Sequence, residues 1–304
     1  YDIILKNGAL ENLYQFARLD RRVAVVTDAG VPAEYAQRVA DQCRDAKIIT
    51  VPQGEASKSM KILESVLRQM LEFNMGRGDL VIAVGGGVVG DLAGFAASIY
   101  MRGIDFINCP TTTLSMIDSS IGGKTAVDLG DTKNIVGAFW QPKLVIVDPD
   151  TLSTLPRRHY INGLAEAVKA SLLADPELFA IFEKGDIDAQ IGEIICRSLR
   201  FKKGIVEQDE TEQGMRKALN FGHTIGHGIE AVKGIKGRRT TGLFHGECVA
   251  LGMLPMIESK ALQKRVRGVY RRLGLPTRTA YDKEKVLAEM LHDKKAQDGQ
   301  ITII

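Results

Sequence analysis

The first half of the chain alternates short apolar runs with amphipathic stretches. Near-continuous runs rich in Val and Ile predict strands that are buried on both faces. These runs are Arg22 to Thr27, Ala46 to Val51, Asp79 to Val84, Asp105 to Cys109 and Lys143 to Asp148. Apolar positions with helical spacing lie between them, as in Pro32 to Cys43 and Met60 to Phe73. Strands that alternate with helices predict a parallel sheet with helices on both faces.

The pattern changes after Asp150. From Gly163 onward, amphipathic helical stretches predominate and strand signals are few. We therefore predict two domains: an α/β, Rossmann-like domain with a parallel sheet over residues 1–150, and an all-α domain over residues 151–304. Within the second domain, Gly234 to Thr241 (GIKGRRTT) lacks periodicity and predicts a loop.

Composition and charge exclude several classes of protein. A length of 304 residues suits two domains of ordinary size. A net charge of +3, from 40 basic and 37 acidic residues, is too balanced to indicate nucleic-acid binding. Four isolated cysteines and no apolar run long enough to cross a bilayer predict a cytoplasmic protein without a membrane partner. The start at Tyr1 rather than Met, and the end at Ile304 inside a β-like run, are expected of a chain trimmed at both ends.

A glycine-rich turn indicates a dinucleotide site. Gly85, Gly87 and Gly90 form the pattern GxGxxG after a predicted strand and at the start of a predicted helix. Glycines in this context allow the backbone to approach a pyrophosphate, and the helix N-terminus offers free N–H groups. Glycine-rich turns between strands and helices are also common as packing devices, so this motif alone is weak.

Polar residues follow the other predicted strands. The acid expected about twenty residues after the glycines is absent, because Cys109 and Pro110 stand there. Asp28 instead ends an earlier strand, where it would bind a ribose or merely cap the next helix. Glu55 with Lys58, and Thr111 to Thr113, follow two further strands. Because ligands bind at the carboxyl ends of parallel strands, this set strengthens the prediction of a nucleotide site.

Three of the five histidines lie between residues 223 and 245. If the segment is one helix, His223, His227 and Glu230 share a face with Asn220 and Arg216. On an earlier helix Asn162, Glu166 and Lys169 also share a face. Two histidines and a carboxylate from separate segments are typical of an open catalytic metal site. The spacing leaves open which two of His223, His227 and His245 bind the metal, and Thr224, where a zinc peptidase has Glu, argues against peptidase chemistry.

Six segments, in order along the chain, resemble the 3-dehydroquinate synthase family. They are Gly85 to Asp91 (GGGVVGD), Asp118 to Lys124 (DSSIGGK), Lys133-Asn134, Gly163 to Lys169 (GLAEAVK), Leu219 to His227 (LNFGHTIGH) and His245-Gly246-Glu247. The resemblance implies a Rossmann-like N-terminal domain, a helical C-terminal domain and a cleft that they share. It also implies bound NAD and a metal, usually zinc, although cobalt, iron or manganese suit the same ligands.

The resemblance also implies roles for residues at matching positions. The metal ligands would be Glu166, His223 and His245, and His227 would then contact substrate or relay a proton. The NAD site would comprise Asp28, Glu55, Lys58, Gly87, Val88, Val89, Gly90, Asp91, Thr111, Thr112, Lys133 and Thr151. The substrate contacts would be Asp118, Lys124, Asn134, Lys169, Lys202, Arg216, Asn220 and Lys294, with Lys295 as an alternative to Lys294. For Lys202 the residues alone leave a solvated surface charge equally open. Arg102 would reach the phosphate from the second subunit of a homodimer.

The activity implied is conversion of 3-deoxy-D-arabino-heptulosonate 7-phosphate, a phosphorylated sugar acid, to 3-dehydroquinate and phosphate in the shikimate pathway. Its steps are transient oxidation by NAD, phosphate elimination, reduction and an intramolecular aldol closure. The run Arg216, Leu219, Asn220, His227 is the dehydroquinate synthase version of a segment that differs in related sugar phosphate cyclases. Alternatives are those cyclases, a metal-dependent NAD polyol or alcohol dehydrogenase, and a non-catalytic sensor of nucleotide and metal. The segment between His227 and His245 is longer than the family pattern, which favours an altered lid or oligomer contact.

Overall fold

The computed structural model describes residues 1–304 except 131, 233–234, 236–241, 293–295, 298–299 and 302–304. The predicted loop at 234–241 lies outside the described residues apart from Ile235. The chain divides into two compact units, Tyr1–Pro156 and Arg157–Ile304, which are described separately below. None of the helices in the described part of the chain combines the length and apolar composition needed to span a membrane. The four cysteines are free thiols.

The first unit is built on a six-stranded sheet in which every pair of neighbouring strands is parallel. In spatial order the strands are β1 (Asp2–Leu5), β8 (Leu144–Val147), β5 (Asp105–Pro110), β4 (Leu80–Gly85), β2 (Arg22–Asp28) and β3 (Asp45–Val51). The five strands predicted from apolar runs are confirmed. The edge strand β1 was not predicted, because four residues are too few to show a periodicity.

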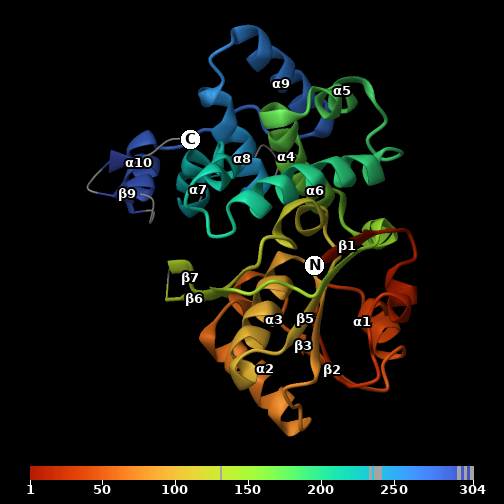
Figure 1. Cartoon of the computed structure of the whole chain (residues 1–304). Coiled ribbons are helices and arrows are strands. Elements are labelled where there is room, and N and C mark those ends of the chain that lie inside the picture. Colours follow the sequence, from red (N-terminus) through yellow and green to blue (C-terminus); the bar gives the residue numbers. More distant parts are fainter. Residues whose placement is uncertain (131, 233–234, 236–241, 293–295, 298–299, 302–304) are drawn as a thin grey trace. The chain divides into compact units, whose positions relative to one another are not determined.

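Helices cover both faces of this sheet (Figure 1). Val23 and Val25 of β2 belong to the core beside α1 (Ala33–Ala40). Ala24 and Val26, which point to the opposite face, belong to the core beside α2 (Met60–Glu72) and α3 (Gly87–Ile99). Because both sets of alternate residues are buried, the strands read as continuous apolar runs.

The order of the strands creates a switch point beside β2. The chain places β3 on one side of β2 and then β4 on the other. Helices that leave the carboxyl ends of β2 and β4 therefore diverge, and such a divergence is where open α/β sheets bind their ligands. Asp28 and Gly85 end these two strands.

A two-stranded hairpin, which the sequence did not predict, packs against α3. Its strands are β6 (Lys124–Leu129) and β7 (Thr132–Phe139), and Val127 joins the core on the α3 side. The Asp128 amide donates to the Lys58 carbonyl oxygen at 2.8 Å, which ties the hairpin to the segment after β3. Shorter helical turns complete the unit: η1 (Leu10–Gln15), η2 (Glu55–Ser57), η3 (Tyr100–Arg102), the π-helical turn η4 (Ser115–Ser119) and η5 (Pro149–Thr154).

The second unit is helical, as predicted (Figure 1). The long helix α4 (Arg157–Ala174) is buried over most of its C-terminal two thirds, and α5, α6 and α8 pack against it. The other helices are α5 (Pro176–Lys184), α6 (Ile191–Gln208), α7 (His223–Ala231), α8 (His245–Met253), α9 (Lys260–Leu273) and α10 (Lys283–His292), with the 3-10 turns η6 (Met215–Asn220) and η7 (Leu254–Met256). Two short antiparallel strands, β9 (Ala296–Gln297) and β10 (Gln300–Ile301), follow α10.

The segment from Arg216 to Glu230 is not one helix, which corrects the predicted single polar face. The turn η6 ends at Asn220, and Gly222 adopts a left-handed conformation with φ of +79° before α7 begins at His223. A Cβ atom on Gly222 would lie 2.4 Å from Cγ of Met253, so the glycine also permits close packing of α8. Arg216 and Asn220 therefore lie on η6, whereas the two histidines and Glu230 lie on α7.

Candidate active site

The carboxyl edge of the sheet carries most residues of the predicted NAD site. Asp28 ends β2, the segment with Glu55 and Lys58 follows β3, and α3 follows β4. Thr111 and Thr112 follow β5, and Thr151 lies in η5 after β8. Since all these strands are parallel, their carboxyl ends lie along the same edge.

The glycine-rich turn leaves the N-terminus of α3 accessible to a ligand. Gly86 is the N-cap and offers no side-chain hydrogen bond to the first turn, which comprises Gly87, Val88 and Val89, whereas the Gly90 amide already donates to the Gly86 carbonyl oxygen at 3.0 Å. The Ser119 hydroxyl is buried and has no hydrogen-bond partner within the described part of the chain. It lies 3.0 Å from the position of a Cβ atom on Gly87. Free backbone N–H groups beside an unpaired hydroxyl suit the phosphates of a dinucleotide.

Lys58 is the buried cation of this edge, with an exposed fraction of only 4%. Its Nζ donates to Oδ2 of Asp91 at 2.7 Å and to Oδ1 of Asn134, and lies 3.8 Å from Oε1 of Glu55. Burial lowers the pKa of Lys58, but the carboxylates of Asp91 and Glu55 outweigh burial and raise it above the usual value. Lys58 therefore stays charged and joins Asp91 of α3 to Asn134 of the β6–β7 hairpin.

Asp28 does not cap the next helix. Its Oδ1 accepts a hydrogen bond from the Gly30 amide at 2.7 Å, whereas the N-cap of α1 is Pro32. Among the threonines of this edge, the Thr151 hydroxyl donates to the Asp148 carbonyl at 2.8 Å. The Thr112 hydroxyl pairs with that of Ser115 at 2.8 Å. These three side chains are thus held in place by the local chain.

The remaining predicted residues of the first unit are spread over other elements. Asp118 lies in η4, and Lys124 starts β6. Lys133 and Asn134 are exposed on β7, where Asn134 has a φ of +53°. Arg102 is exposed in the turn between α3 and β5, at the amino end of the strands. It therefore lies at the opposite edge of the sheet from the glycine-rich turn.

In the second unit, Glu166 and Lys169 lie one turn apart on α4 and are almost completely buried. The Lys169 ammonium forms an ion pair with Oε2 of Glu166 and donates to the Leu219 carbonyl oxygen at 2.7 Å. Neither oxygen of Glu166 accepts a hydrogen bond within the described residues. A buried carboxylate without hydrogen bonds is costly unless cations surround it.

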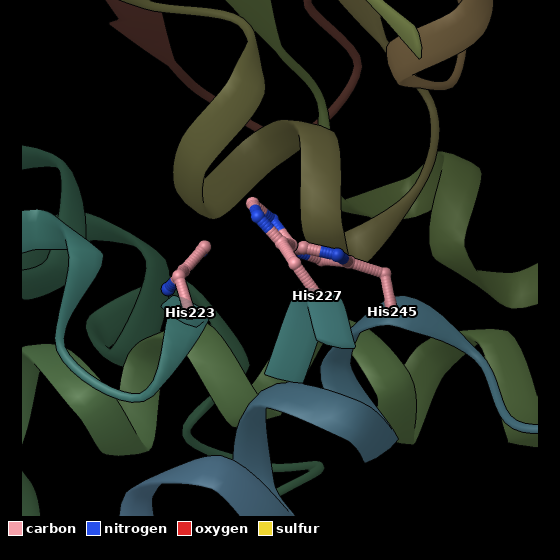
Figure 2. A group of neighbouring side chains, drawn as sticks. All are labelled: His223, His227 and His245. Atoms are coloured by element: carbon pink, nitrogen blue, oxygen red, sulfur yellow. The ribbon is translucent and has the colours of Figure 1, made fainter. Parts of the chain in front are cut away.

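Three histidines of this unit form a cluster next to the Glu166 carboxylate. His223 and His227 come from α7 and His245 from the first residue of α8, and Figure 2 shows the three side by side. One nitrogen of each ring lies within 4.8 Å of one nitrogen of both others. The Nε2 atoms of His223 and His245 lie 3.5 and 3.7 Å from Oε1 of Glu166. The structure thus brings the predicted ligands Glu166, His223 and His245 together, with His227 beside them.

These distances fit a bound metal ion. Ligand atoms roughly 2.0–2.2 Å from a tetrahedral zinc ion are about 3.4 Å from one another, close to the two separations from Glu166. The two oxygens of Glu166 have different neighbours: Oε1 faces His223 and His245, and Oε2 faces Lys169. Oε1, with two histidine nitrogens near it and no hydrogen bond among the described residues, therefore has the surroundings of a single-oxygen metal ligand.

The far nitrogens of two rings are also held. The Nδ1 atom of His245 lies 2.9 Å from Oε2 of Glu230, and that of His223 lies 3.4 Å from the Phe221 carbonyl oxygen. Burial lowers the pKa of His245, but the hydrogen bond to Glu230 and the charge of Glu166 outweigh it and raise the pKa. Two carboxylates thus flank this ring, which favours a positive charge between them.

The second unit also carries the other residues that were predicted to contact the substrate. Lys202 on α6 and Arg216 on η6 are buried, with exposed fractions of 8% and 2%. The Asp209 carboxylate accepts hydrogen bonds from the amides of Gln213, Gly214 and Arg216, which shapes the turn that carries Arg216. The Asn220 amide donates to Glu212 at 2.7 Å. The predicted Lys294, and Lys295, lie outside the described residues.

Gly246 allows α8 to contact α4 directly beside His245. Its amide donates to Oδ1 of Asn162 at 2.7 Å, and a Cβ atom there would lie 2.0 Å from the Asn162 carbonyl oxygen. Gly246→Ala must therefore separate the two helices, and we expect the free energy of unfolding to fall by about 1–3 kcal/mol. Zinc binding should weaken as well, because His245 moves with α8.

Chemical denaturation and a zinc titration of the purified variant measure both effects. Gly268→Ala on α9 is the matched control, because nothing lies within 4 Å of its Cβ position. This control should gain about 0.4–1 kcal/mol, since alanine restricts the unfolded chain more than glycine does. A Gly246→Ala protein as stable as the control would contradict the packing argument.

The sequence of the chain matches known protein families over most of its length. The sequence model of the family described as 3-dehydroquinate synthase N-terminal matches residues 48–162, and that described as 3-dehydroquinate synthase C-terminal matches residues 163–296. A 3-dehydroquinate synthase from Caulobacter vibrioides is 41% identical, over all of this chain and 89% of that protein.

Solved structures share the fold. A 2-epi-5-epi-valiolone synthase from Streptomyces hygroscopicus subsp. jinggangensis, with NAD+ and Zn2+ bound, superposes with a TM-score of 0.85 at 29% identity, over 98% of this chain and 88% of that one. A 2-deoxy-scyllo-inosose synthase, complexed with carbaglucose-6-phosphate, NAD+ and Co2+, gives a TM-score of 0.87 at 25% identity, over 97% and 85% of the two chains. With both halves of the family pattern matched in order, the chain belongs to the 3-dehydroquinate synthase family.

Proposed function

We propose that the protein converts 3-deoxy-D-arabino-heptulosonate 7-phosphate into 3-dehydroquinate and inorganic phosphate, a step of the shikimate pathway that leads to aromatic amino acids. The observation that carries the proposal is the buried Glu166 carboxylate, with one oxygen toward two histidines and the other toward Lys169. Membership of the family supports the choice of this reaction over others with the same cofactors.

Glu166, His223 and His245 would hold the metal ion, and zinc or cobalt suits this ligand set. The NAD site would comprise the carboxyl-edge residues Asp28, Glu55, Lys58, Gly87, Val88, Val89, Gly90, Asp91, Thr111, Thr112 and Thr151, with Lys133 nearby. When bound, NAD supplies a reversible hydride acceptor, and the metal supplies a Lewis acid that lowers the pKa of a substrate hydroxyl.

The cations of the chain would bind the two anionic groups of the substrate. Lys169, Lys202 and Arg216 are buried, and a buried cation binds a phosphate or carboxylate more strongly than an exposed one does. Lys169 is held at a defined point by Glu166 and the Leu219 carbonyl, so it offers a charge that needs little reorganisation. The exposed Lys124 and the residues Asp118, Asn134 and Asn220 would add further substrate contacts, together with Lys294.

His227 would serve the substrate rather than the metal. It lies one turn after His223 on α7, and its ring centroid is 5.3 Å from that of His223 and 5.7 Å from that of His245. A histidine next to a metal-bound substrate can accept or donate a proton near neutral pH. This assignment leaves three protein ligands and an open position for the substrate.

Phosphate release without accumulation of NADH is the expected signature of this reaction. The purified protein, supplied with zinc and NAD+, should release one phosphate per heptulosonate phosphate consumed. Absorbance at the band of reduced nicotinamide should stay flat, because each hydride taken from the substrate is returned. A phosphate assay and an absorbance record on the same sample measure both quantities.

The alternatives predict different outcomes in the same assay. A polyol or alcohol dehydrogenase would build up one NADH per substrate oxidised and release no phosphate. A cyclase of a different sugar phosphate would turn over another heptulose or hexose phosphate and leave the heptulosonate phosphate intact. A sensor would bind NAD+ and zinc but consume no substrate. Any of these three results would overturn the proposed reaction.

The assembly proposed is a homodimer in the cytoplasm. Arg102 is exposed at the amino end of the strands, away from the glycine-rich turn of its own sheet. That position suits a residue that serves a second subunit. The four free cysteines suit a reducing compartment.

A further inference from the structure

We infer that Glu230 is a positioning residue that orients His245 as a metal ligand and strengthens metal binding. The inference rests on the metal site proposed above and adds to it a residue that binds neither metal nor substrate. In the sequence Glu230 stands out only as one more polar position on the histidine helix. Its contact with His245 comes from the packing of α7 against α8.

Side chains from two helices, Glu247 of α8 and Asn162 of α4, hold the two neighbours of His245. The Phe244 amide donates to Oε2 of Glu247 at 2.8 Å, and the Gly246 amide donates to Oδ1 of Asn162 at 2.7 Å. These two bonds fix the main chain on either side of His245. They leave the imidazole ring free to rotate about its side-chain bonds, so the ring needs a restraint of its own.

Glu230 supplies that restraint. Its Oε2 lies 2.9 Å from Nδ1 of His245, while Nε2 of the same ring lies 3.7 Å from Oε1 of Glu166. In the neutral ring, which is the form that binds a metal, a carboxylate at Nδ1 places the proton on that nitrogen and leaves the lone pair on Nε2. The lone pair then points to the side where Glu166 and His223 converge. Metal-binding histidines are oriented in this way by outer carboxylates, which also make the ring a stronger donor.

The contact of Glu230 also joins two helices of the proposed metal site. Glu230 lies on α7, two turns after the ligand His223, and reaches a ligand on α8. It therefore links the two helices that carry the histidine ligands at the level of the metal site. Loss of the link should weaken metal binding more than it weakens the fold.

The test compares the zinc affinity of the parent with that of Glu230→Gln and Glu230→Ala. Full-length proteins stripped of metal are titrated with Zn2+ in competition with a chromophoric chelator, and Co2+ absorption reports the ligand geometry. We expect the dissociation constant for zinc to rise about 10-fold in Glu230→Gln and toward 100-fold in Glu230→Ala. The Co2+ bands should shift, while the melting temperature of the metal-free protein stays close to that of the parent.

Glu183→Gln is the matched control, because it breaks a two-bond ion pair with Arg265 in the same unit, away from the histidines. Its zinc affinity should equal that of the parent. Affinities within twofold of the parent for both Glu230 variants would overturn the inference, and if the alanine variant does not fold, Glu230→Gln decides alone. A parent protein that binds no zinc would instead overturn the proposed metal site, so the two failures are distinguishable.

Discussion

Removal of the Glu166 carboxylate is expected to remove the metal and the activity together. In Glu166→Ala, the oxygen that lies 3.5 and 3.7 Å from the two histidine nitrogens is gone. The zinc dissociation constant should rise at least about 100-fold, because loss of a direct ligand exceeds the 10–100-fold cost of losing an outer partner. His223→Ala and His245→Ala should lose metal in the same way. Elemental analysis of the purified proteins and the phosphate assay measure the two effects.

His227→Ala is the informative control for this set. Its ring lies beside the proposed ligands, yet the proposal assigns it to the substrate. The variant should therefore keep its zinc and lose turnover. If His227→Ala lost its metal while His223→Ala or His245→Ala kept theirs, the ligand assignment would be wrong.

Lys169→Ala is expected to lose turnover and to keep its metal. The Lys169 ammonium contacts Oε2 of Glu166, whereas Oε1 faces the histidines, so a metal ion can still bind after the lysine is removed. Its loss takes a fixed buried cation away from the position where substrate charge is to be bound. Removal of a single preorganised group of this kind costs about 10²–10³-fold in turnover. We expect a decrease of about 10³-fold in kcat/KM, measured by phosphate release, with one equivalent of zinc retained.

Lys203→Ala provides the matched comparison for Lys169. Lys203 is an exposed lysine of the same unit, and its partner Glu207 lies one turn further along α6 at 3.5 Å. Loss of such a surface pair changes stability by less than about 1 kcal/mol. This variant should turn over at the parental rate. A Lys169→Ala protein that was equally active would exclude a catalytic role for the lysine.

Much of the fold could be predicted because its signals are local. The four central strands β2, β4, β5 and β8 are buried on both faces, so each forms an apolar run in the sequence whatever lies beside it in space. The shared face of Glu166 and Lys169 was also predictable from local sequence, because residues three apart lie on the same side of a helix such as α4.

The parts that sequence reasoning missed depend on contacts between distant segments. The β6–β7 hairpin is held by packing against α3 and by the bond from Asp128 to the Lys58 carbonyl, and its own residues carry no strong strand pattern. The break at Gly222 combines a left-handed backbone with close packing against Met253, thirty-one residues further on, and that packing is not visible in the local sequence.

The residue types at the site were determined by the sequence itself: two histidines at helical spacing, a carboxylate and a lysine on one face of another predicted helix, and a glycine-rich turn after a strand. Only the tertiary structure decided how they meet. The packing of α4, α7 and α8 places Oε1 of Glu166 against His223 and His245, turns Oε2 to Lys169, and sets Glu230 behind His245. The physical reason is that helical spacing specifies neighbours on one helix, whereas atoms around a metal ion come from several helices whose mutual positions depend on side-chain packing.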